Sequence, residues 1–285
     1  MDLTPRDLGA RIMSAARARR APGFSIESGE TVADGPQVYE ELTDVVAAVL
    51  HGLPNEGWAQ PARPYRWSVH DLLGHLLAVE RYTATRLGVP GMGGIPEPGD
   101  DHHLTFADAV IAFERTRAPT NTLADWWEVV GRVRDIARPG LLPDRPVALH
   151  GLRLHPPALL VLRGFELWIH AEDISRAVHA PPTIPSAGAV RAMAELSIGK
   201  LVPLALPAVR VAPARDVRVV LTGAGGGTWN LALGDGQASA LLVLDVVEYC
   251  RYAAGRHDRA DLDVHIEGDA ALVEDVLAAS RLLAV

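Results

Sequence analysis

Apolar residues recur every three or four positions along most of the first two thirds of the chain. This spacing places them on one face of a helix. It predicts helical segments at about residues 38–50, 68–87, 105–137 and 157–178. Ser68 begins the second segment as an N-cap, with Asp71 as its acidic partner three residues later. The third segment is broken near Pro119. Long helices joined by a Gly- and Pro-rich loop at 88–101 predict a helical bundle.

The pattern changes after about residue 215, where short β-type runs alternate with turns. These runs predict strands at about 217–221, 228–233, 240–244 and 262–266, with helices at about 245–254 and 270–283. Intermixed strands and helices predict a small mixed α/β domain. The glycine run at 223–227 predicts a turn between strands rather than a phosphate-binding loop, because neither Lys-Ser/Thr nor a helix follows it.

The chain therefore divides into three parts within an α+β fold. Residues 1–35 form an N-terminal extension, residues 36–182 form the helical bundle, and residues 183–285 form the mixed domain. The extension carries an amphipathic helical pattern that ends before Pro22, and its charges balance. This pattern favours an arm packed on its own fold or on a second subunit over a membrane or nucleic-acid arm.

Composition narrows the functional classes. The 285 residues carry a net charge of −8, which argues against nonspecific binding to nucleic acid or anionic membranes. No apolar run reaches the ~18 residues of a membrane span, and the first residues lack the pattern of a secretory signal. The single cysteine, Cys250, lies in an apolar stretch. It indicates a buried thiol, rather than a nucleophile, in a reducing cytoplasmic compartment.

The fourth helical segment carries the most distinctive chemistry. It is apolar in nearly every direction, yet Arg163, Glu166, His170 and Asp173 form one polar stripe along it. A buried carboxylate and imidazole cost free energy unless they are paired or bind a metal. His75 lies within the apolar stripe of the second segment and can supply a third ligand. Two imidazoles and a carboxylate suit catalytic zinc.

The spacing also allows a plainer interpretation. Glu166 and His170 can form an ordinary exposed pair four residues apart, and His75 can be a hydrogen-bonded core histidine. The sequence contains no His-Glu-x-x-His run of a metalloprotease and no Gly-x-Ser-x-Gly of an esterase.

Two segments resemble a known family. Residues 67–76 (Trp-Ser-Val-His-Asp-Leu-Leu-Gly-His-Leu) resemble a signature of the mycothiol-dependent maleylpyruvate isomerase family, part of the DinB-like metalloenzyme superfamily. Residues 163–174 (Arg-x-x-Glu-x-x-x-His-x-x-Asp-Ile) resemble the signature of that family's fourth helix. The C-terminal region is similar to the family's second domain at residues 255–256 and 268–269. The resemblance covers about residues 37–285.

The resemblance implies a DinB-like four-helix bundle with a metal-dependent, thiol-utilising site. The family's metal ligands correspond to His75, Glu166 and His170. The implied cofactors are a divalent metal, with zinc expected, and mycothiol as the thiol cosubstrate. The implied partner is a small electrophile, which the thiolate attacks. Isomerisation and S-transfer both stay open, because the same ligands serve both outcomes.

Three further residues are candidates for catalysis. Arg163 can orient Glu166, bind an anionic substrate, or form a structural ion pair. Asp173 can hold a ligand histidine or belong to the helix end. Arg256 can meet a substrate carboxylate.

Two positions depart from the family pattern and leave the substrate open. His70 stands where arginine is frequent, and Gly74 stands where alanine is common. Of the 27 basic residues, Lys200 is the only lysine. This bias fits a high-GC, actinobacterial-type source in which mycothiol is the expected thiol. The alternative function is a non-catalytic metal- or ligand-binding protein of the same fold, and the oligomeric state stays open.

Overall fold

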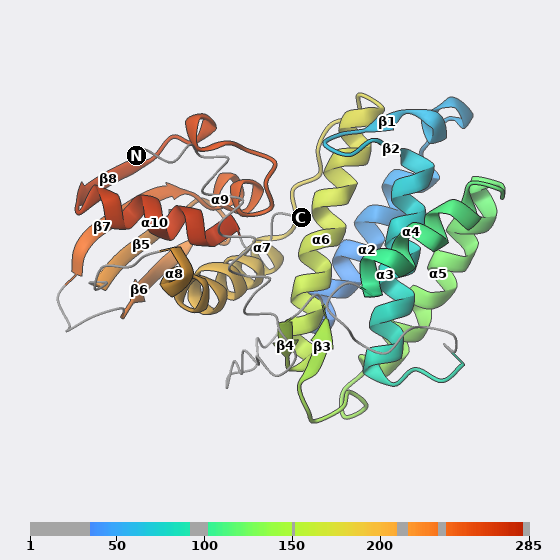
Figure 1. Cartoon of the computed structure of the whole chain (residues 1–285), viewed down its shortest axis with the longest axis horizontal. Helices are drawn as coiled ribbons and strands as arrows, with labels where there is room; N and C mark the ends of the chain where they lie inside the picture. The colour runs from blue at the N-terminus through green and yellow to red at the C-terminus, as the bar shows by residue number, and fades with distance from the viewer. Residues whose placement is uncertain (1–34, 92–101, 150–151, 210–215, 233–237, 282–285) are drawn as a thin grey trace. The chain divides into compact units, whose positions relative to one another are not determined.

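The computed structural model describes residues 35–91, 102–149, 152–209, 216–232 and 238–281. Nearly all of the predicted N-terminal extension, and most of the predicted loop at 88–101, lie outside these residues. The described chain divides into two compact units, of which one ends at Ile184 and the other begins at Pro185. The first is mainly helical and the second combines helices with a sheet (Figure 1).

The helical unit contains the bundle that the sequence predicts. Its helices are α2 (Gly35–His51), α3 (Val69–Leu87), α4 (His102–Glu114), α5 (Pro119–Ile136) and α6 (Pro156–Ala177). Helix α2 packs on α6, and α3 packs against both α4 and α5. The predicted break near Pro119 is confirmed, because α5 begins at that proline.

Short elements at the helix ends were not predicted. They are the 3-10 turn η1 (Asn55–Ala59), the hairpin of β1 (Pro61–Ala62) with β2 (Trp67–Ser68), and the hairpin of β3 (Val147–Leu149) with β4 (Leu152–Leu154). Strands of two or three residues are too short to show an alternating pattern.

Helix α3 begins where the sequence places its N-cap. The Ser68 hydroxyl accepts a hydrogen bond from the Asp71 backbone N–H, and the Asp71 carboxylate accepts one from the Ser68 backbone N–H, each at 3.1 Å. This capping box is therefore confirmed. Arg115 adds two hydrogen bonds to the same carboxylate, at 2.8 and 3.1 Å. The helix ends at Gly88, which has φ 85°, a conformation that glycine adopts without a steric cost.

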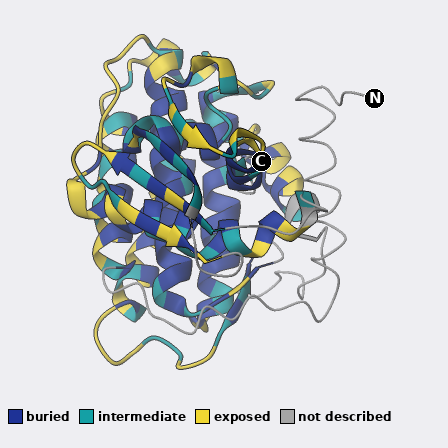
Figure 2. Cartoon of the chain, turned by 90° about the vertical axis from the view of Figure 1, so that its left-hand side faces the viewer, coloured by how far each residue is buried: buried dark blue, intermediate teal, exposed yellow. Residues whose placement is uncertain are grey.

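Helix α6 is the central element of the helical unit. Most of its residues are buried, which accounts for the weak separation of its apolar and polar faces. The helices of this unit are dark blue over much of their length in Figure 2. Gly164 lies where α2 approaches: a Cβ atom there would be 2.9 Å from Val38 Cγ1 and 3.1 Å from Leu42 Cδ1. The absence of a side chain therefore lets the two helices pack closely.

The second unit is built on a four-stranded sheet. Its strands are β5 (Asp216–Thr222), β6 (Gly227–Leu231), β7 (Ala238–Asp245) and β8 (His265–Gly268), in the order β6-β5-β7-β8. Strands β5 and β7 are parallel, and both edge strands pair antiparallel with their neighbours. Helices α9 (Val246–Ala253) and α10 (Ala270–Ser280) pack against it.

Two features of this unit differ from the predicted pattern. Strand β8 begins at His265 rather than at Leu262, because the 3-10 turn η3 (Arg259–Asp261) and its cap occupy the residues before it. The proline-containing stretch also forms three unpredicted helical elements: α7 (Ala187–Ala194), the π-helical η2 (Glu195–Leu201) and α8 (Val202–Val209). The π-helical turn breaks the 3.6-residue period of an α-helix. Pro207, which lies within α8, is a residue that usually predicts the end of a helix.

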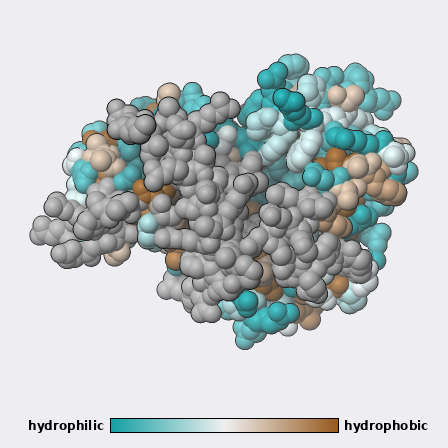
Figure 3. All heavy atoms as spheres, in the orientation of Figure 1, coloured by the Kyte–Doolittle hydropathy of each residue, from teal (hydrophilic) through white to brown (hydrophobic). Residues whose placement is uncertain are grey.

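Burial alternates along the sheet. In β5, Val217, Val219 and Leu221 are buried, whereas Arg218 is exposed, and the strands facing the viewer in Figure 2 show this change of colour. Cys250 on α9 is fully buried, as predicted. On the face drawn in Figure 3, the described surface is mainly hydrophilic with small hydrophobic areas. Among the described helices, none has the length and apolar character needed to cross a membrane.

The close contact at Gly164 can be tested by adding a methyl group. We expect Gly164→Ala to lower the free energy of unfolding by about 1–3 kcal/mol, because the new Cβ overpacks the contact between α2 and α6. Gly131 on α5 is the matched control, since no atom lies within 4 Å of a Cβ placed there. Gly131→Ala should raise stability by up to about 1 kcal/mol. Equal effects of the two variants in chemical denaturation would contradict this interpretation.

The capping box predicts a pH-dependent contribution to stability. Burial of Asp71 opposes its ionisation, but hydrogen bonds from Arg115 and Ser68 outweigh this effect and lower the pKa of the Asp71 carboxyl. A carboxyl with a lowered pKa stabilises the fold above its unfolded pKa, and this contribution is lost as the pH falls through the folded value.

We therefore expect Asp71→Asn to lower the free energy of unfolding at neutral pH by about 1 kcal/mol or less, since Arg115 is largely exposed. The difference from wild type should disappear only at acid pH, below the lowered pKa of Asp71 in the folded state. Urea titrations over a pH series, with the exposed Asp135→Asn as control, measure this. A difference that does not change with pH would show that the charge of Asp71 is not involved.

Candidate metal centre

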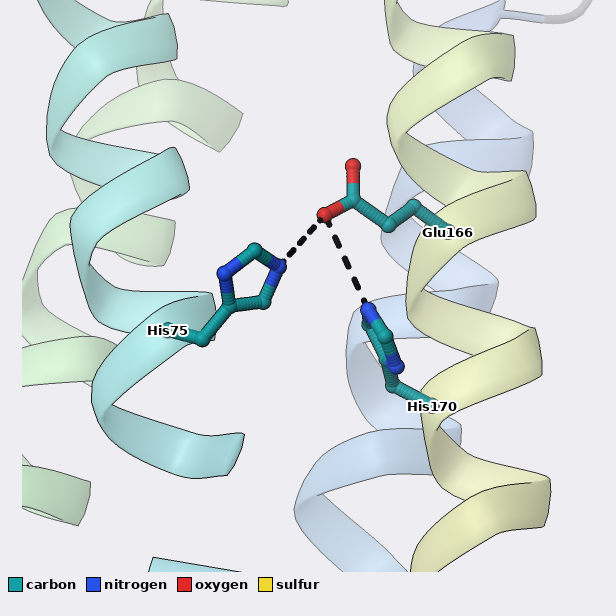
Figure 4. A group of neighbouring side chains, drawn as sticks. All are labelled: His75, Glu166 and His170. Carbon is teal, nitrogen blue, oxygen red and sulfur yellow. Dashed lines mark hydrogen bonds and ion pairs between the residues drawn. The ribbon is translucent and has the colours of Figure 1, made fainter. Parts of the chain in front are cut away.

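Helices α3 and α6 bring three potential ligands together. His75 projects from α3, while Glu166 and His170 project from successive turns of α6 (Figure 4). One potential ligand atom of each residue lies within 4.8 Å of those of the others. Within the described parts of the chain, this is the only such group of three or more. The three predicted ligands thus lie together, although His75 is 91 positions from Glu166 in the sequence.

The distances suit a single ion. Glu166 Oε1 lies 3.1 Å from His75 Nε2 and 3.8 Å from His170 Nε2. Tetrahedral zinc, with ligands at 2.0–2.1 Å, places neighbouring ligand atoms about 3.3 Å apart. Two imidazole nitrogens and one carboxylate oxygen are also a donor set that zinc prefers, and they leave coordination positions for other molecules. The residues present therefore fit a divalent metal.

His170 is held by a neighbour on the same helix. Its Nδ1 lies 3.3 Å from Asp173 Oδ2, and both side chains are nearly fully buried. Arg176 also contacts the Asp173 carboxylate, at 3.4 Å. Burial lowers the pKa of His170 although Asp173 opposes this effect, and the neutral imidazole is the form that binds metals. A proton on Nδ1, shared with Asp173, leaves the Nε2 lone pair directed at the cluster.

His75 is oriented by ring packing. The Trp67 ring lies 5.1 Å from the His75 ring, and Tyr65 stacks on Trp67 at 4.6 Å. Tyr65 also lies 5.8 Å from the His170 ring. Within the described structure, the buried Nδ1 of His75 has no hydrogen-bond partner. The side chains of His75 and Glu166 stay 15% and 22% exposed, so the cluster can be reached from outside.

Arg163 lies behind Glu166, away from solvent. It is fully buried, and its Nη1 donates to Glu166 Oε2 while its Nη2 donates to Glu80 Oε1 at 2.6 Å. Tyr39 in turn donates to Glu80 Oε2 at 2.7 Å. Burial opposes the charge of Arg163, but Glu166 and Glu80 raise its pKa, so it stays cationic. Its burial suits holding Glu166 better than binding a substrate.

Glu80 and Tyr39 were missed by sequence reasoning. Glu80 follows Leu73 and Leu77 at helical spacing, so its position on the apolar face was a readable signal. Tyr39 gave no comparable signal, because a tyrosine on an apolar helix face is ordinary.

Arg256 belongs to the other unit. It follows α9, and its Nη1 donates to the Ala254 carbonyl at 2.7 Å. Its expected contact with a substrate carboxylate stays a prediction.

The chain is similar to known proteins. Residues 39–175 match the model of the family described as mycothiol maleylpyruvate isomerase N-terminal domain. The chain is 25% identical, over 245 residues, to uncharacterized proteins of Mycobacterium tuberculosis strains CDC 1551 / Oshkosh and ATCC 25618 / H37Rv. The alignment covers 85% of this chain and 91% of each relative.

The fold is also similar to a solved structure. The crystal structure of the mycothiol-dependent maleylpyruvate isomerase superposes with a TM-score of 0.53 at 16% sequence identity, covering 84% of this chain and 94% of the other. This likeness shows a shared α+β fold. The family match spans the segment that contains His75, Glu166 and His170. Over residues 39–175, which lie in its helical unit, the chain therefore matches the mycothiol maleylpyruvate isomerase N-terminal domain family.

Proposed function

We propose that this protein is a metal-dependent enzyme that uses mycothiol as a cosubstrate and acts on a small electrophile by isomerisation or S-transfer. The observation that carries this proposal is the convergence of His75, Glu166 and His170, whose ligand atoms lie within 4.8 Å of one another. The family match supports mycothiol as the thiol. We further propose zinc as the metal and the cytoplasm as the compartment.

A bound metal would favour the deprotonated form of the thiol. When bound, a divalent cation stabilises the thiolate form of a thiol whose pKa is otherwise near 8.5. His75, His170 and Glu166 would hold the ion through two nitrogens and one oxygen. Asp173 keeps His170 in the required orientation, and Arg163 keeps Glu166 in place. Trp67 and Tyr65 form an aromatic boundary beside the two histidines.

The sulfur must come from outside the chain. Cys250 is fully buried on α9, and burial raises the pKa of its thiol well above the ordinary value. It therefore lacks both the access and the ionisation that a nucleophile needs.

Isomerisation and transfer begin with the same attack. Addition of the thiolate to an activated double bond gives an enolate with a single bond that can rotate, and elimination then returns the thiolate and the isomer. If the enolate takes up a proton instead, the thioether is the product and transfer results. The three ligands are common to both outcomes, so the electrophile decides between them.

Removal of a ligand histidine tests the proposal directly. We expect the purified protein to hold about one divalent metal per chain and His75→Ala or His170→Ala to lose it, together with the mycothiol-dependent conversion of an electrophile. His265→Ala is the control, because His265 forms an exposed pair with Glu267 at 2.8 Å. Elemental analysis that finds no metal in the wild type would refute the site. Bound metal without thiol chemistry would favour a binding protein.

The role of Asp173 can be measured separately. We expect Asp173→Asn to weaken zinc binding by about 10–100-fold, because His170 loses the carboxylate that orients its ring. Competition with a chelating dye measures the affinity, and the exposed Asp135→Asn serves as the control. Unchanged affinity would assign Asp173 to the helix end alone.

A further inference from the structure

Three large polar side chains lie fully inside the helical unit. Tyr39 on α2, Glu80 on α3 and Arg163 on α6 each have 0% exposure. Burying an ion pair costs free energy that the pair's own attraction often fails to recover, and well-packed apolar residues would serve the core equally well. Stability alone therefore does not account for these residues.

Their hydrogen bonds form one continuous path. Tyr39 donates to Glu80 Oε2 at 2.7 Å, and Arg163 donates to Glu80 Oε1 at 2.6 Å. Both oxygens of Glu80 are thus occupied. Burial, together with the negative charge of Glu80, raises the pKa of Tyr39, so the phenol keeps the proton that it donates. Arg163 then uses its other terminal nitrogen on Glu166 Oε2.

The path ends at the candidate metal centre. Because Arg163 occupies Oε2 of Glu166, the other oxygen, Oε1, is the one directed at His75 and His170 (Figure 4). The planar guanidinium is suited to this task, since its fixed fork holds two carboxylates in one geometry, whereas a lysine offers a single flexible point charge.

We propose that Tyr39 and Glu80 are positioning residues that fix Arg163, so that Arg163 holds Glu166 as a ligand through Oε1 alone. This inference rests on the metal site proposed above and extends it to residues that do not touch the ion. A carboxylate bound through one oxygen occupies one coordination position, so positions stay open for a thiol and a substrate. The partial sharing of the Glu166 charge with Arg163 also reduces the negative charge that the ligand gives to the ion.

Cobalt binding tests this arrangement independently of catalysis. The variants are Tyr39→Phe, Glu80→Gln and Arg163→Lys in the full-length chain. Cobalt(II) reports on its ligands through its visible absorption, and zinc affinity follows from competition against bound cobalt. Thermal unfolding by circular dichroism separates loss of folding from loss of the site.

Tyr249→Phe is the matched control. Tyr249 is a fully buried phenol in the other unit, with Ser197 at 2.8 Å and Ser280 at 3.2 Å. Its substitution removes a buried hydroxyl group in the same way as Tyr39→Phe.

We expect Glu80→Gln and Arg163→Lys to weaken zinc binding by about 10–100-fold, and Tyr39→Phe to weaken it by about tenfold or less. All three should alter the cobalt spectrum at saturation, because Glu166 is no longer held through Oε2. Tyr249→Phe should change neither quantity. A loss of stability alone would leave the spectrum of the saturated protein as in the wild type.

The result that would overturn this inference differs from the result that would overturn the proposed function. If the wild type binds cobalt, and the folded variants match its affinity and spectrum, the inference is wrong while the metal site stands. An equal change in Tyr249→Phe would also overturn the inference. If the wild type binds neither cobalt nor zinc, the proposed site and this inference both fail. Should Glu80→Gln not fold, the cobalt spectrum of saturated Tyr39→Phe decides.

Discussion

The helical unit depends on keeping charge inside an apolar bundle. Helix α6 is buried on nearly every side, yet it carries Arg163, His170 and Asp173 in its interior. Each of these groups has a partner: Glu80 on α3 pairs with Arg163, and His170 pairs with Asp173 three residues further along α6. The cost of burying an unpaired charge therefore constrains how α2, α3 and α6 pack. Gly164 fits this view, since it leaves room for α2, the helix that carries Tyr39, to pack closely on α6.

The sequence predicted the long elements well because their signals are local. The spacing of apolar residues and the Ser68–Asp71 cap identified α3, and the polar stripe on α6 identified Glu166 and His170. The hairpin that carries Trp67 was missed, since its strands have two residues each. The π-helical turn at Glu195–Leu201 was missed because it breaks the helical period. Glu80 was missed for a different reason: its place on the apolar face of α3 was a readable signal, but the sequence does not show that Arg163 and Tyr39 on other helices are its partners.

The two candidate ligand histidines are held by different kinds of interaction. His170 is nearly fully buried, and Asp173 fixes one of its ring nitrogens by a hydrogen bond. His75 is more exposed and is held by packing against Trp67, which fixes the plane of a ring without fixing its proton. The hydrogen bond with Asp173 therefore restrains the His170 ring more tightly than packing restrains the His75 ring. The side chains of Glu166 and His75 are the more exposed part of the cluster.

This difference bears on where specificity resides. In the proposed site, the buried residues behind Glu166 and His170 hold these two ligands through hydrogen bonds. They would therefore act alike on any electrophile. Discrimination between substrates would come from groups beside the more exposed part of the cluster, where the Trp67 and Tyr65 rings lie next to the histidines. Two proteins with the same ligands and the same buried partners can then differ in reaction, because isomerisation and transfer share the thiolate attack and diverge afterwards.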